Sequence, residues 1–84
     1  MENRYNVQLI VPCLYMTYDI LIPVNKNIAE IITVIIKGLK ILTNSNFSLN
    51  QKMHLYNAVT GEEYEYNLSV LQTNIKNGSK LILN

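Results

Sequence analysis

One segment near the middle of this 84-residue chain has the pattern of an amphipathic α-helix, and it limits the folds that remain. Its apolar side chains recur at the i, i+3, i+4 and i+7 spacing that places them on one side of a helix. They are Ile28, Ile31, Ile32, Ile35, Leu39 and Leu42. Asn27 is a favourable N-cap, and Glu30 three residues later completes a capping box. Gly38 destabilises such a helix by up to about 1 kcal/mol relative to alanine, which predicts a close packing contact at that position.

Four segments have apolar residues at alternate positions, as β-strands with one buried face do. They are residues 7–11, 18–22, 53–57 and 81–83. The first two are close enough in sequence to form an N-terminal hairpin. The polar run 43–52 ends the helix and forms a loop, and Thr60-Gly61-Glu62 predicts a turn toward a short strand around Tyr64. Residues 69–72 predict a brief helical turn, and Asn77-Gly78 predicts a turn before the last strand.

These elements predict an α+β fold in which one long helix packs across a mixed sheet of four to five strands. A chain of this length buries roughly 60–65% of its unfolded surface around one core and is too small for a second. Hydrophobic residues make up 49% of the sequence and charged residues only 15%, a composition typical of a folded globular chain. We therefore expect a single domain that spans residues 1–84.

Charge and cysteine content argue against several classes of function. The basic residues are scattered and the net charge is +1, whereas nucleic-acid binding usually requires a basic stripe. Cys13 is the only cysteine, so we expect no disulfide framework and no zinc site. No cofactor is predicted. The apolar segment is shorter than the ~20 residues that span a bilayer, and the N-terminal region lacks the pattern of a signal peptide. A cytoplasmic protein without direct membrane insertion is predicted.

The order strand, strand, long helix, strand, short strand, turn, strand resembles the ubiquitin β-grasp, in which one helix packs diagonally across a mixed sheet. Ile20-Leu21-Ile22-Pro23-Val24 followed by Ile28 is similar to the second strand and the helix start of that family. The segment 69–75, with the polar turn and Leu81-Ile82-Leu83 that follow, is similar to its closing part. The resemblance covers residues 6–83.

Four runs of residues carry a closer resemblance. They are Tyr18-Asp19-Ile20-Leu21-Ile22-Pro23, Leu55-Tyr56-Asn57, Thr60-Gly61-Glu62-Glu63 and the segment 75–83. Together they resemble the YukD-like family, the small ubiquitin-like accessory proteins of Gram-positive type VII secretion systems. This resemblance implies a cytoplasmic bacterial protein that is not an enzyme and that assists a membrane-bound, ATP-driven export machine. The implied partners are protein components of that secretion apparatus.

The carboxyl end of the sequence bears on how such a domain acts. A ubiquitin-like modifier or sulfur carrier is activated through a flexible, unhindered Gly-Gly end, whereas this sequence ends in Leu83-Asn84, which has neither flexibility nor small side chains. We therefore expect action by protein–protein recognition. The alternative, a modifier or sulfur carrier, predicts covalent adducts or a terminal thiocarboxylate.

A few polar residues have the chemistry for catalysis or metal binding, but their spacing argues against both. His54 is the only histidine, and no carboxylate, serine or cysteine lies at a spacing that suggests a dyad or triad with it. We expect His54 to face solvent from a strand, and Cys13 to be a small buried hydrophobe. Glu62, Glu63 and Glu65 predict a solvated turn, with cation chelation or attraction of a basic partner as alternatives. No catalytic residue and no metal ligand is predicted.

The alternation of the strands predicts one binding surface. If Leu55 points inward, Tyr56 points outward, and by the same alternation Ile10, Leu21 and Ile82 point away from the helix. In a β-grasp sheet Ile10, Tyr56 and Ile82 lie on neighbouring strands and form an apolar patch with His54 and Lys80 at its rim. Exposed apolar patches commonly mark partner sites, and tyrosine is a favoured anchor. Homo-oligomerisation through the same patch is a further possibility.

Overall fold

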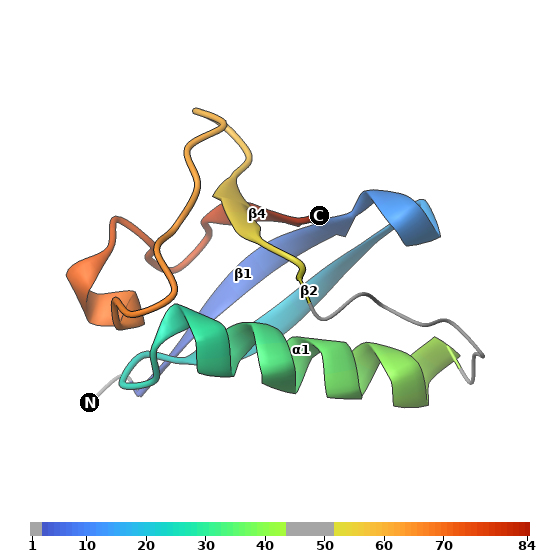
Figure 1. The fold of residues 1–84 in the computed structure, drawn as a ribbon, viewed down its shortest axis with the longest axis horizontal. Helices are drawn as coiled ribbons and strands as arrows, with labels where there is room; N and C mark the ends of the chain where they lie inside the picture. The colour runs from blue at the N-terminus through green and yellow to red at the C-terminus, as the bar shows by residue number, and fades with distance from the viewer. Residues whose placement is uncertain (1–2, 44–51) are drawn as a thin grey trace.

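The four segments with alternating apolar residues form a single mixed sheet in the computed structural model, which describes residues 3–43 and 52–84. The strands are β1 (Arg4–Val11), β2 (Met16–Pro23), β3 (Leu55–Asn57) and β4 (Lys80–Leu83), and they lie side by side in the order β2-β1-β4-β3. β1 pairs antiparallel with β2 and parallel with β4, and β3 pairs antiparallel with β4. The two central strands therefore come from opposite ends of the described chain (Figure 1).

The predicted helix is α1 (Ile28–Thr43), which lies along one side of the sheet (Figure 1). Asn27 caps it, because its Oδ1 accepts a hydrogen bond of 2.9 Å from the N–H of Glu30. The carboxylate of Glu30 does not complete the predicted capping box, since it lies 3.7 Å from Nζ of Lys26 one turn earlier. Residues 44–51, which include most of the predicted polar loop, lie outside the described residues.

The core lies between α1 and the inner face of the sheet. The helix buries five of the six residues predicted to face the core, Ile28, Ile31, Ile32, Ile35 and Leu39, whereas Leu42 near its end is 65% exposed, contrary to the prediction. The strands bury the alternate residues that face the helix. The fully buried large side chains are Leu9, Ile22, Ile28, Ile31, Leu55, Leu81, Leu83, Val7, Val11 and Val70. The predicted α+β architecture of one helix on a mixed sheet is confirmed, with four strands among the described residues.

The structure differs from the sequence predictions in three places. β1 and β2 are joined by the short 3-10 helix η1 (Pro12–Leu14), and Cys13 in this turn is exposed rather than buried because it follows the last inward residue of β1. Gly38 lacks the predicted close packing contact among the described residues, since a Cβ added there meets none of their heavy atoms within 4 Å. Tyr64 does not belong to a fifth strand; its neighbour Glu63 makes only an isolated bridge to Tyr56.

The last part of the described chain is held by turns. The short 3-10 helix η2 (Val70–Gln72) confirms the predicted helical turn, and Ser69 and Gln72 form a capping box around it. Gly78 has a φ of 86°, a left-handed conformation that glycine adopts without a steric penalty, and it confirms the predicted turn before β4. In residues 3–43 and 52–84 no helix has the length and apolar character needed to cross a bilayer.

Candidate protein-binding surface

Three apolar side chains form a row across the outer face of the sheet, on the side opposite α1. Ile10 of β1 is the cross-strand partner of Ile82 of β4, and Ile82 is the partner of Tyr56 of β3. All three are half-buried. We call Ile10, Ile82 and Tyr56 the outer row. Neighbouring strands of a sheet lie about 4.7–4.9 Å apart, so these three partnered side chains make one continuous apolar strip.

The alternation of the strands explains why this row faces outward. Leu9, Leu81 and Leu55 precede the three residues of the outer row by one position, and each is 0% exposed in the core. Because successive side chains of a strand point to opposite faces, burying these leucines turns the outer row away from the helix. The register therefore brings together the three apolar residues that the sequence placed in one patch.

The two predicted rim residues occupy opposite sides of the outer row. Lys80 is exposed on β4 two residues before Ile82, with Gln8 as its partner on β1. His54 lies two residues before Tyr56, and its backbone exchanges two hydrogen bonds with Asn84, of 2.9 and 3.0 Å. Both rim side chains thus share the outer face with the row.

The imidazole of His54 is part of a polar cluster with Glu63 and Tyr66. Its Nδ1 lies 2.7 Å from Oε2 of Glu63 and 3.0 Å from the hydroxyl oxygen of Tyr66. The Tyr66 ring stacks on the imidazole with a centroid distance of 5.3 Å and an interplanar angle of 18°. Tyr66 also donates a hydrogen bond of 2.9 Å to the carbonyl of Met53. We call His54, Glu63 and Tyr66 the histidine cluster.

This cluster corrects one sequence interpretation and adds to another. His54 has a carboxylate partner, although its spacing to the carboxylates suggested none. Glu62, Glu63 and Glu65 are exposed, as predicted for a solvated turn, and Glu63 also contacts His54. The contact arises because the chain folds back on β3: Tyr64 N–H donates to the carbonyl of Leu55, and Glu63 faces Tyr56 across the isolated bridge. His54 and Glu63 are then diagonal neighbours on one face, a separation that long side chains can span.

The segment that folds back on β3 also contains one ionisable group with a changed pKa, Tyr64. Burial raises the pKa of the Tyr64 phenol above its usual value of 10.0, the side chain of Asn57 opposes the shift, and the charge of Glu62 adds to it. The same hydroxyl donates a hydrogen bond of 2.6 Å to Oδ1 of Asn74. Tyr64 is therefore an internal support for the hairpin that carries Glu63.

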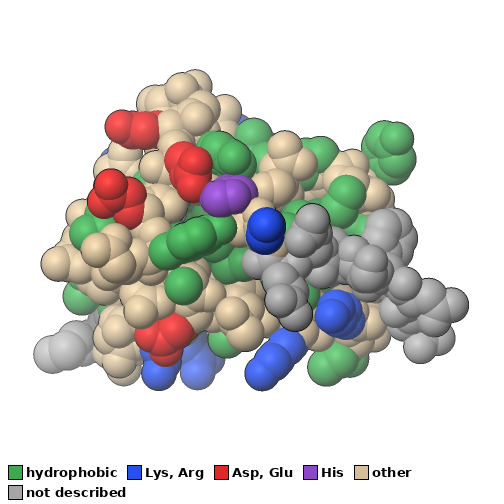
Figure 2. All heavy atoms as spheres, in the orientation of Figure 1, with side chains coloured by type: hydrophobic (Ala, Val, Ile, Leu, Met, Phe, Trp, Pro, Cys, Tyr) green, Lys and Arg blue, Asp and Glu red, His purple; other side chains and the backbone are tan. Residues whose placement is uncertain are grey.

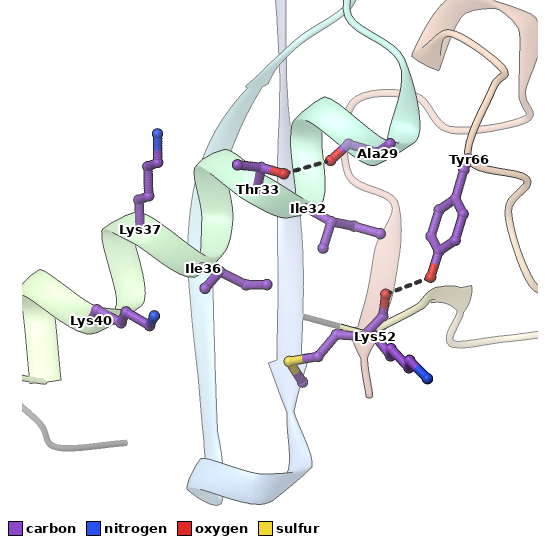
Figure 3. A pocket seen from close by; sticks show the side chains of 9 residues that line it. Ala29, Ile32, Thr33, Ile36, Lys37, Lys40, Lys52 and Tyr66 are labelled. Carbon is purple, nitrogen blue, oxygen red and sulfur yellow. Dashed lines mark hydrogen bonds between the residues drawn. The ribbon is translucent and has the colours of Figure 1, made fainter. Parts of the chain in front are cut away.

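On the other side of Tyr66 an open groove of about 540 Å³ runs along α1. Figure 3 shows Lys37, Lys40 and Lys52 around it, with Ile32 and Ile36 on the helix and Tyr66 opposite. In the space-filling view (Figure 2) lysine and arginine side chains lie mainly along the helix, and most visible carboxylates lie beyond the histidine. The histidine cluster thus separates a basic region from an acidic one.

The outer row and the histidine cluster together have the chemistry of a recognition surface. The row offers apolar area with a tyrosine at its end, and the cluster adds hydrogen-bonding and charged groups beside it. Within the described ranges, no three His, Cys, Asp or Glu side chains converge in a way that would hold a metal ion.

Comparisons with known proteins give matches at the level of structure alone. No family model and no curated protein matches this sequence. The ubiquitin-like domain of the Mycobacterium tuberculosis type VII secretion system protein ECCD1 superposes with a TM-score of 0.73 at 11% identity, covering 98% of each chain. A chain of the MycP5-free ESX-5 inner membrane complex gives 0.72 at 12% identity, over 99% of this chain and 21% of that one.

A third similar structure is a ubiquitin-like domain from another protein. The N-terminal ubiquitin-like domain of the 4931431F19Rik protein superposes with a TM-score of 0.75 at 18% identity, covering 100% of this chain and 76% of that one. At such identities the likeness shows the fold alone. The chain has the ubiquitin-like β-grasp fold, and the fold resemblance inferred from the order of its elements is confirmed.

Proposed function

We propose that this protein is a non-enzymatic, YukD-like accessory protein of a Gram-positive type VII secretion system. In this proposal it works in the cytoplasm and binds a protein component of the membrane-bound secretion apparatus through the outer row. Its likeness in fold to a ubiquitin-like domain of a type VII secretion protein supports this assignment, together with the four sequence runs that resemble the YukD-like family.

The observation that carries the proposal is the register of the sheet. It aligns Ile10, Ile82 and Tyr56 across three strands on the face that the helix leaves uncovered. A half-buried apolar strip on a rigid sheet can be covered by a partner with little loss of conformational entropy, because the side chains are already held by their neighbours. A tyrosine within such a strip is a typical anchor, and truncation of an anchor costs roughly 2 kcal/mol or more of binding free energy.

Position-specific photo-crosslinking in the native bacterium tests the proposal. A photoreactive phenylalanine analogue at position 56 should form a light-dependent covalent product with a component of the secretion apparatus. The matched control places the same analogue at Leu71, which is 62% exposed on η2 away from the outer row. We expect the product from position 56 and not from position 71.

Two outcomes contradict the proposal. Equal products from positions 56 and 71 indicate contacts without surface preference, and a specific product with a protein outside the secretion apparatus assigns the surface to another process. Intact-mass measurement of the protein from the same cells addresses the alternative function, because a modifier or sulfur carrier accumulates covalent adducts or a thiocarboxylate without light.

A further inference from the structure

The helix has a second apolar side that the core does not use. Val34, Ile41 and Leu42 are 59%, 82% and 65% exposed, and with Gly38 they follow the i, i+4, i+7, i+8 spacing of one helix face. We call Val34, Gly38, Ile41 and Leu42 the second stripe. A helix that packs against a single sheet needs only one apolar side, so the second stripe is available for another surface.

The strand nearest this stripe has a free edge. β2 is the outermost strand of the sheet, so alternate N–H and C=O groups along its eight residues point away from β1. An apolar groove of about 270 Å³ separates β2 from α1, and its lining includes Ile20, Val34, Gly38 and Leu42 and no charged side chain. The edge of the sheet and the second stripe therefore form one apolar face.

Exposed apolar side chains concentrate on the elements that border this face. Of the nine large hydrophobic residues that are exposed among the described residues, six belong to α1, β2 or the turn before β2. They are Tyr15, Met16, Leu21, Val34, Ile41 and Leu42. Edge strands of monomeric proteins are usually protected by inward charges, bulges or covering segments, whereas the only charged residue on β2 is Asp19.

Gly38 adds an independent observation. A glycine within a helix lowers helix stability, yet no heavy atom of residues 3–43 and 52–84 lies within 4 Å of a Cβ added at Gly38. The packing contact that the sequence predicted is therefore not found within the part of the chain that the structure describes, and Gly38 lines the groove between α1 and β2. A glycine at this position lets the backbone of a second helix approach closely.

We propose that this face binds a second copy of the same chain in a two-fold symmetric dimer. β2 of one copy pairs antiparallel with β2 of the other, which joins the two sheets into one continuous sheet. The two helices then lie on the same side of that sheet and meet through their second stripes. Such an interface is isologous, because each copy presents the same edge and the same stripe.

A second copy fits this face better than a single added strand. A lone strand pairs with the β2 edge and fills the groove, but it leaves Ile41, which does not line the groove, uncovered. A second copy supplies both a strand edge and an apolar helix stripe. The net charge of +1 opposes association only weakly, because two nearly neutral molecules repel each other little.

The dimer is compatible with the outer row and independent of it. The outer row lies on the sheet face opposite the helices, so in the joined sheet the two rows face the same direction. A dimer would then present two identical docking surfaces to an oligomeric partner, which increases avidity without a new contact.

Sedimentation velocity over a concentration range from low micromolar to near-millimolar tests the dimer. We expect a monomer–dimer equilibrium that Val34→Glu or Leu42→Glu weakens by about tenfold or more in Kd. The matched controls are Val59→Glu and Leu71→Glu, which introduce the same charge at positions that are also exposed, at 82% and 62%, away from this face. The controls should leave the equilibrium unchanged.

Gly38→Ala provides a second readout that separates folding from association. Because space is open around Gly38 in the monomer, the substitution should raise the unfolding temperature measured at low concentration while it weakens the dimer. A strictly monomeric protein at near-millimolar concentration overturns the proposal. So does a dimer that is unaffected by Val34→Glu and Leu42→Glu, or one that is lost equally in the controls.

Discussion

Replacing Leu81 by alanine should destabilise the protein far more than replacing its neighbour Ile82. Leu81 is 0% exposed at the centre of the core, whereas Ile82 is half-buried on the outer face. Removal of three buried carbon groups at about 0.8 kcal/mol each gives about 2.4 kcal/mol, and the cavity left in a close-packed core raises this to about 3–4 kcal/mol. Ile82 loses about half the transfer term and leaves no closed cavity, so we expect about 1–1.5 kcal/mol.

Urea unfolding followed by circular dichroism measures this difference. With a slope of about 1 kcal/mol per molar urea for a small domain, the two variants should differ in midpoint by roughly 2 M. The comparison tests the register, because a shift of one residue exchanges the core face with the outer face. Equal losses, or a larger loss for Ile82→Ala, would refute the assignment of the outer row to the surface.

Three further predictions concern single side chains. Asn27→Ala should lower the free energy of unfolding by about 1 kcal/mol, because the N–H of Glu30 loses its cap, and thermal unfolding would show it; an unchanged unfolding temperature would contradict that role. Tyr66→Phe removes the hydrogen bond to Met53 and should destabilise the fold by about 1 kcal/mol in urea titration, whereas no loss would show that water replaces this bond without a penalty. Because the pKa of Tyr64 is raised in the folded state, its stabilising contribution is fully present below pH 10 and is lost as the pH rises through the folded-state pKa. The urea midpoint should therefore fall in that range and fall less in Tyr64→Phe, and parallel curves for the two proteins would argue against it.

The fold was predictable because the local patterns agree with one another. The spacing from Ile28 to Leu39 fixes which side of the helix is buried, and alternation in the strands fixes which residues face it. Neither pattern determines which strands are neighbours. The parallel pairing that places Ile10 beside Ile82 follows from the β-grasp topology, so the resemblance to that fold carried this part of the prediction.

The histidine cluster was not predictable from spacing alone. His54 and Glu63 are nine residues apart, and their contact depends on the geometry of the turn around Gly61, which has a φ of 79°. Pairing the residues after this turn one by one with those of β3 places Glu63 opposite Tyr56, as the structure shows. Cys13 shows the same limit, since its exposure follows from the short helix that connects β1 to β2.

Gly38 is instructive because the close packing contact predicted at this position is not found among the described residues. A glycine inside a helix costs stability relative to alanine, and this cost alone does not say where a close neighbour lies. The structure shows instead that Gly38 faces the open groove beside β2. A sequence pattern does not distinguish a contact within the molecule from one between molecules.

The most direct test of the account measures protein export in the native bacterium after replacement of the chromosomal gene by variants. Tyr56→Glu introduces a charge into the outer row, and Leu71→Glu introduces the same charge at an exposed apolar position elsewhere. With equal protein levels, we predict that type VII export is lost or strongly reduced in Tyr56→Glu and retained in Leu71→Glu. Full export in Tyr56→Glu would contradict the proposal that the outer row binds the secretion apparatus.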